Sequence, residues 1–143
     1  MIVLDTNVLS EALRPSPVET VLRWLAAQDP VTVFTTTITQ AEVLYGVEVL
    51  PVGRRRSRLY SAIEKLFADE FSGRILPFDE DSARVFPKVV AHREAVGRPI
   101  AQFDAMIASI CRSYGAAIAT RNVSDFEDCG VPIIDPWNVA QAS

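Results

Sequence analysis

The sequence of 143 residues has few of the side chains on which several kinds of enzyme depend. It contains one histidine, His92, and two cysteines, Cys111 and Cys129, whose spacing matches no zinc or redox motif. This excludes a ribonuclease mechanism with two histidines, leaves a serine-histidine-aspartate triad without support, and makes a zinc centre unexpected. The six glycines are isolated from one another, so the sequence has no glycine-rich loop for a nucleoside triphosphate.

Positive charge and long apolar runs are also scarce. The net charge is -4, whereas proteins that coat nucleic acid are normally basic, so any contact with nucleic acid must be local. Twelve of the 14 basic residues are arginines, which suit bidentate contacts to phosphate or carboxylate. The apolar run over residues 1–4 stops at Asp5 and is too short for a signal-peptide core or a membrane span. We therefore expect a cytoplasmic protein with reduced thiols and no membrane segment.

Apolar patterning predicts strands that alternate with helices. Strands are expected at residues 1–4, 31–37, 74–78 and 116–119, with residues 131–134 as a candidate fifth strand. Helices are expected at residues 8–13, 18–29, 39–51, 54–69, 79–97 and 103–114, and Pro87 predicts a kink or break in the fifth of these. The alternation predicts a single α/β domain over residues 1–143, with a central, mainly parallel sheet of four or five strands flanked by helices. Reactive groups in such sheets gather at the carboxyl ends of the strands.

Four acidic residues occupy these strand-helix junctions: Asp5, Glu42, Asp104 and Asp125. Each has a local explanation, since Asp5 can cap a helix and Glu42 can close a capping box with Thr39, while the other two can serve as caps or turn residues. Local explanations do not predict that all four stand at equivalent places in a converging sheet. Clustered carboxylates repel one another unless a cation neutralises them, and Mg²⁺ or Mn²⁺ prefers such oxygen ligands. The pattern predicts phosphodiester hydrolysis by a metal-activated water.

Four segments carry a recognisable pattern: residues 2–9 (IVLDTNVL), 39–46 around Glu42, 103–108 (FDAMIA) and 119–126 (ATRNVSDF). In this order they resemble a PIN domain of the VapC type, the ribonuclease toxin of bacterial toxin-antitoxin pairs. The resemblance implies three central acids and metal ligands, Asp5, Glu42 and Asp104, a fourth in Asp125, and supporting polar groups in Thr6, Thr120 and Asn122. Members of the family vary between Asp and Asn in the last segment, so Asn122 is an alternative to Asp125 as the fourth ligand.

The resemblance also implies partners. It implies an RNA substrate, a homodimer, and a small antitoxin that binds DNA and blocks the active site, so that this chain meets DNA only through the antitoxin. A basic cluster is a candidate contact for RNA or antitoxin, or else a solvated helix start: Arg54, Arg55, Arg56 and Arg58.

Two other functions use the same features. A DNA-directed nuclease would use the same acids, and a non-catalytic PIN-like module would act through its binding surfaces alone. A phosphatase of the haloacid-dehalogenase kind is disfavoured, because it needs a second Asp two residues after Asp5, where this sequence has Asn7.

Overall fold

The computed structural model describes residues 1–139, and the last four residues of the predicted domain, 140–143, lie outside them. Its five strands are β1 (Ile2–Leu4), β2 (Val33–Thr36), β3 (Ile75–Leu76), β4 (Ala117–Ala119) and β5 (Ile133–Ile134). They form one sheet in the order β3-β2-β1-β4-β5, and every neighbouring pair is parallel. The prediction of an α/β sheet with four or five strands is confirmed, and the sheet is wholly rather than mainly parallel.

Each strand is shorter than its predicted range, and for β2 and β3 the structure shows a local reason. Residues 30–32 form a 3-10 turn, η1 (Pro30–Thr32), in which the side chain of Asp29 accepts a hydrogen bond from the Val31 amide at 3.2 Å. A proline in the first turn suits such a start, so β2 begins only at Val33. In β3, Pro77 follows the second strand residue and has no amide to continue the ladder.

Seven helices connect and follow the strands in the described part of the chain. They are α1 (Thr6–Ala12), α2 (Glu19–Ala26), α3 (Thr37–Glu48), α4 (Arg54–Lys65), α5 (Glu80–Ala95), α6 (Gln102–Tyr114) and α7 (Val123–Phe126). After Lys65, α4 continues as a wider π turn, η2 (Leu66–Glu70), so the helix predicted over residues 54–69 changes its winding near its end.

Of the kink or break predicted at Pro87, the break is wrong, because α5 runs through this residue. A proline inside a helix forfeits one hydrogen bond, here to the carbonyl of Ala83 four residues earlier. Both Pro87 and Ala83 are exposed, so water can satisfy that carbonyl and the helix continues.

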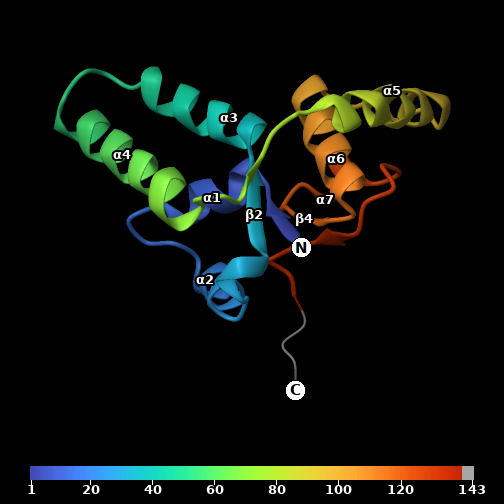
Figure 1. The fold of residues 1–143 in the computed structure, drawn as a ribbon. Helices are drawn as coiled ribbons and strands as arrows, with labels where there is room; N and C mark the ends of the chain where they lie inside the picture. The colour runs from blue at the N-terminus through green and yellow to red at the C-terminus, as the bar shows by residue number, and fades with distance from the viewer. Residues whose placement is uncertain (140–143) are drawn as a thin grey trace.

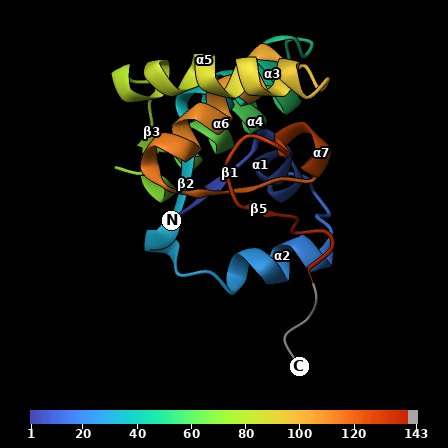
Figure 2. The same cartoon turned by 90° about the vertical axis from the view of Figure 1, so that its right-hand side faces the viewer.

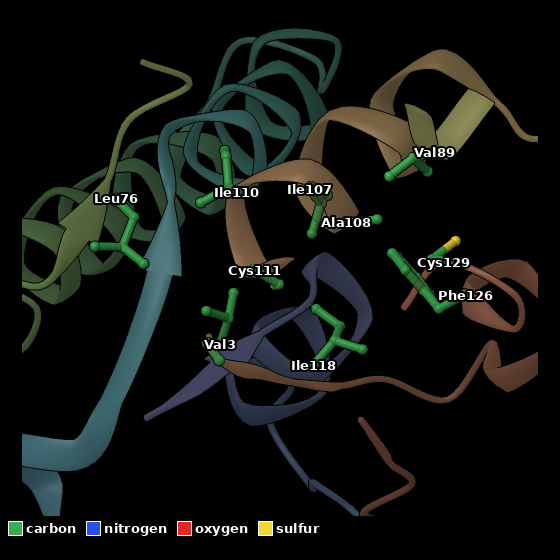
Figure 3. Packing of buried hydrophobic residues seen from close by; sticks show 11 residues of the cluster. Val3, Leu76, Val89, Ile107, Ala108, Ile110, Cys111, Ile118, Phe126 and Cys129 are labelled. Carbon is green, nitrogen blue, oxygen red and sulfur yellow. The ribbon is translucent and has the colours of Figure 1, made fainter. Parts of the chain in front are cut away.

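The sheet separates two layers of helices. Consecutive strand residues point to opposite faces, so Val3 and Ile118 pack with α5 and α6, whereas Leu4 and Ala119 pack with α1 to α4. Figure 3 shows the first of these clusters, with strand side chains directed at Ile107 of α6. Figures 1 and 2 show β2 running from the end where α2 lies toward the end where α3 begins. The carboxyl ends of all five parallel strands therefore face the α3 end of the molecule.

The two cysteines and the single histidine lie outside the candidate acid cluster. Both cysteine thiols are free and buried, and His92 is exposed in the last turn of α5. In the part of the chain that the structure describes, no helix combines the length and apolar character needed to cross a bilayer.

Candidate active site

The candidate site lies where the direction of sheet building reverses. From β1 the chain adds β2 and β3 on one side, then returns to add β4 and β5 on the other, so β1 and β4 are neighbours at the centre. Open parallel sheets bind ligands at such a switch point, outside the carboxyl ends of the strands. Asp5 follows β1 and Thr120 follows β4, and the Asp5 amide donates to the Ala119 carbonyl at 2.9 Å.

Asp5 is held by three hydrogen bonds at this point. Its Oδ1 accepts from the Thr6 amide at 2.8 Å, and its Oδ2 accepts from the Thr120 hydroxyl at 2.8 Å and from the Asn7 side-chain amide at 3.2 Å. The first bond caps α1 as expected, whereas the other two orient the carboxylate across the switch point. The side chain is buried, and burial raises its pKa against the opposing effect of these hydrogen bonds.

Glu42 does not close the predicted capping box with Thr39. The helix begins two residues earlier than predicted, and its N-cap is the fully buried Thr36, whose hydroxyl accepts from the Thr39 amide at 3.0 Å. Glu42 instead accepts from the Thr6 hydroxyl at 2.9 Å. Burial raises the Glu42 pKa, and the negative charge of Asp5 raises it further. Its contacts therefore belong to the acid cluster and not to the start of the helix.

Thr36→Val should lower the free energy of unfolding by about 1 to 2 kcal/mol, because it keeps the shape of the side chain but leaves the Thr39 amide without an acceptor. In metal-free buffer, Glu42→Gln should cause no such loss, since it also relieves repulsion from Asp5. Urea unfolding of both variants with EDTA measures the difference. Equal destabilisation by the two substitutions would show that Glu42 does stabilise the start of the helix, as the capping box predicts.

Asp104 lies in the first turn of α6, which has no side-chain cap, so the expected capping role for Asp104 is absent. Its pKa is raised to about 6, first by burial and then by the charges of Asp5, Asp125 and Glu42. The charge of Arg93 opposes this rise. Charges act over a limited distance in a protein, so the other three acids, from three separate segments of the sequence, lie within electrostatic range of Asp104.

The chemistry of this donor set fits a hard divalent cation. Within residues 1–139, no three Asp, Glu, His or Cys side chains converge as a ready-made metal cage. Mg²⁺ does not need one, because it is commonly held by one or two carboxylates while it keeps several waters. A cation bound between these acids would also relieve the repulsion that raises the Asp104 pKa.

Comparison with known proteins assigns this arrangement to a family. The PIN domain family matches residues 2–130. The chain belongs to the PIN domain family. The VapC ribonuclease Y4jK of Sinorhizobium fredii is 39% identical over 140 residues, which cover 98% of this chain and 100% of the relative. Toxin FitB of Neisseria gonorrhoeae is 37% identical over 138 residues, covering 96% and 99%. The solved structure of FitAB bound to an IR36 DNA fragment matches with a TM-score of 0.93 and 36% identity, covering 100% of both chains. The resemblance seen in the sequence is confirmed.

A groove of about 830 Å³ lies between α1, α3 and α4 of this PIN domain. Three arginines of the basic cluster line it: Arg54, Arg55 and Arg58. Glu42 lines it too, so the groove opens onto the acid cluster. Arg56 does not line this groove and pairs with Glu48 at 3.0 Å. The basic cluster is thus divided between a groove surface and a local ion pair.

The supporting polar groups of the PIN domain differ in their contacts. Thr6 and Thr120 contact acids directly, as the resemblance implied. Asn122 donates its backbone amide to the Thr120 hydroxyl at 3.1 Å, and its side chain caps nothing in α7. Asp125 is the residue of this segment whose charge raises the pKa values of Asp5 and Asp104. Asp125 therefore lies within electrostatic range of two other acids, and its assignment as the fourth ligand in place of Asn122 stays a prediction.

Sequence reasoning missed the role of Asn7. Its side-chain amide donates to Asp5 and, at 3.2 Å, to the Thr120 hydroxyl, while its carbonyl oxygen accepts from the Arg121 amide at 3.2 Å. Asn7 therefore joins the first turn of α1 to the loop after β4. The available signal was the unbroken polar run Asp-Thr-Asn directly after an apolar strand.

Proposed function

We propose that this PIN-domain protein is a Mg²⁺-dependent endoribonuclease, with Mn²⁺ able to substitute, and that it acts in the cytoplasm as the toxin of a toxin-antitoxin pair. The observation that carries the proposal is the Asp104 carboxyl, whose pKa is raised to about 6 by burial and by three neighbouring acids at the switch point of the sheet. A cation explains why buried acids whose charged forms are disfavoured by burial and by mutual repulsion are kept at this place. The relatives supply the substrate class, since they include a VapC ribonuclease.

Each residue of the cluster has a proposed task. Four acids would hold the cation: Asp5, Glu42, Asp104 and Asp125. A divalent cation supplies Lewis acidity, which activates water as a nucleophile and stabilises negative charge on the departing oxygen. The hydroxyl groups of Thr6 and Thr120 keep two carboxylates directed toward the site through the bonds already described. The low exposure of Asp5 strengthens its electrostatic effect on anything bound there.

We propose the groove beside Glu42 as the binding site of the antitoxin. Its floor is apolar, with Val43, Val47 and Ile63, and its edge carries Arg54, Arg55 and Arg58. This suits a partner segment that combines apolar and acidic side chains. The solved structure of FitAB bound to a DNA fragment supports an antitoxin that carries the complex to DNA, so that this chain meets DNA indirectly. Two exposed apolar residues, Tyr45 on α3 and Val49 directly after it, support a homodimer.

The proposal is tested by incubating the purified protein with matched RNA and single-stranded DNA of the same sequence. We expect cleavage of RNA with Mg²⁺ or Mn²⁺, no cleavage with EDTA, and recovery when Mg²⁺ is restored in excess. Undiminished cleavage in EDTA would contradict the metal mechanism. Preferential cleavage of DNA would establish the DNA-directed alternative, and the absence of any cleavage by a folded, Mg²⁺-binding protein would establish the non-catalytic one.

A further inference from the structure

The segment that carries Asp125 is too short to be stable as an isolated helix. The helix α7 has four residues, far fewer than the 12 to 15 or so that an isolated helix needs. The backbone bends again directly after it, where Asp128 has a positive φ of 60°. Phe126 anchors the turn in the core, but one buried side chain leaves the rotation of the turn undetermined. The direction of the Asp125 carboxylate must therefore be fixed by contacts from other elements.

Arg93 supplies such contacts from the last turn of α5. Its side chain is buried, with 4% of its surface exposed. It donates through Nη1 to the carbonyls of Ser124 at 3.2 Å and Glu127 at 2.5 Å, and through Nε to the carbonyl of Arg98 at 2.6 Å. These carbonyls offset the cost of burying the guanidinium, and within residues 1–139 no ion pair involves it.

Two of the three carbonyls flank Asp125. Ser124 precedes it by one residue and Glu127 follows it by two, so the planar guanidinium fixes the backbone on both sides of the acid. Arg98 holds the same turn from the surface, since its Nη2 donates to the Ser124 carbonyl at 3.1 Å and its Nη1 pairs with Glu127 at 2.9 Å. Neither arginine appears among the residues that the sequence pattern singled out.

We propose that Arg93 is a positioning residue that aims Asp125 into the acid cluster by clamping the carbonyls of Ser124 and Glu127, with Arg98 as a second, outer clamp. The inference rests on the proposed cation site. It deepens that site by giving Asp125, and not Asn122, the fourth position: the clamped carbonyls bracket Asp125, whereas Asn122 precedes both. Arg93 does not itself bind the cation; its positive charge lowers the Asp104 pKa, and its positioning role is exerted through Asp125.

The test is a double-mutant cycle read by Mn²⁺ binding, measured by titration calorimetry on the full chain. Arg93→Met should weaken Mn²⁺ binding about tenfold or more, the size of effect typical of groups that orient a ligand. In the Asp125→Asn background the same substitution should cause no further loss, because the group it positions is already gone. Arg93→Lys, which keeps the charge but not the planar fork, should fall between wild type and Arg93→Met.

Three controls separate the outcomes. Val21→Ala removes buried volume from α2 on the other face of the sheet, so it should lower stability and leave Mn²⁺ affinity unchanged. If Arg93→Met does not fold, Arg98→Gln loosens the same Ser124 carbonyl and must show the same dependence on Asp125. Wild-type protein that binds no Mn²⁺ would refute the proposed function. The proposed site stands if wild-type protein binds Mn²⁺ and Asp5→Asn does not. In that case, the clamp alone would be refuted by normal Mn²⁺ affinity in Arg93→Met, or by an equal loss of affinity with and without Asp125→Asn.

Discussion

Asp104→Asn should reduce Mg²⁺-dependent RNA cleavage about a hundred- to a thousandfold, the range found when one group that stabilises developing charge is removed. Asparagine keeps the size of the side chain but lacks the negative charge that a divalent cation requires. Asp5→Asn and Glu42→Gln should behave alike, because asparagine still caps α1 and Glu42 caps nothing. Cleavage is measured on one RNA substrate at fixed Mg²⁺, with folding checked by circular dichroism. Full activity in all three variants would remove the basis for calling this protein a nuclease.

The same substitution should raise metal-free stability, with a definite dependence on pH. The Asp104 pKa rises from 3.8 to about 6 on folding, so the native state favours the neutral carboxyl, and its ionised form destabilises the fold above about pH 6. Below about pH 4 the carboxyl is neutral in both states and the cost disappears. Allowing for solvent screening at a half-buried group, Asp104→Asn should gain about 1 kcal/mol, or about 4 °C in Tm, at pH 7.5 and nothing at pH 3.5.

Asp79→Asn is the matched control for both measurements. Asp79 accepts hydrogen bonds from the backbone amide and hydroxyl of Ser82, each at 2.9 Å, and from the Tyr114 hydroxyl at 3.0 Å. The Ser82 contacts, with a smaller contribution from Tyr114, lower the Asp79 pKa. Its ionised form therefore stabilises the fold above pH 4, and this contribution is lost as the pH falls below that value. Asp79→Asn should leave cleavage unchanged and lower Tm at pH 7.5, which is the opposite pattern to Asp104→Asn.

Reversing the charge of the groove should release the antitoxin. A variant with Arg54→Glu, Arg55→Glu and Arg58→Glu should bind the cognate antitoxin about a hundredfold more weakly, since three reversed contacts at about 1 kcal/mol each amount to that factor. RNA cleavage by the variant should consequently resist inhibition by that protein. Affinity is measured by calorimetry or by inhibition of cleavage. Unchanged affinity would remove the groove from the antitoxin site.

Weaker binding by this variant should not arise from unfolding of α4. The three arginines occupy the first turns of α4, whose dipole disfavours positive charge, so glutamates there should stabilise the helix. The matched control carries the same three reversals at exposed arginines that do not line the groove: Arg23, Arg84 and Arg112. That variant should bind the antitoxin normally. Equal weakening in both variants would show a general effect of net charge.

The sequence predicts most of the architecture because the apolar pattern alternates cleanly. The strand 116–119 and the helix after Phe103 appear almost where expected, and the acids gather because parallel strands end at one edge. The task of these acids as ligands stays a prediction. Strand ends were less predictable: β2 begins after a turn capped by Asp29, which the run of β-branched residues concealed.

Long-range hydrogen bonds explain what the sequence did not reveal. The sequence alone does not distinguish Thr36 from Thr39 as the N-cap. The capping box is excluded by the cap at Thr36 and by the contact of Glu42 with Thr6, 36 residues away. Asn7 meets Thr120 across 113 residues. Arg93 resembles any arginine near the end of a helix, a place where positive charge is favourable anyway. No local pattern separates such residues from ordinary surface groups.

Because the order of the strands reverses between β1 and β4, the site can form only late in the synthesis of the chain. The first acid follows the first strand, but its partner Thr120 and the turn with Asp125 come from the last quarter of the chain. A ribosome releases the chain from its N-terminus, so Asp5, Glu42 and Asp104 emerge before the strand that completes their surroundings. An unfinished chain consequently lacks β4, the strand beside β1, and a cell that makes this protein holds no assembled site until synthesis has passed residue 125.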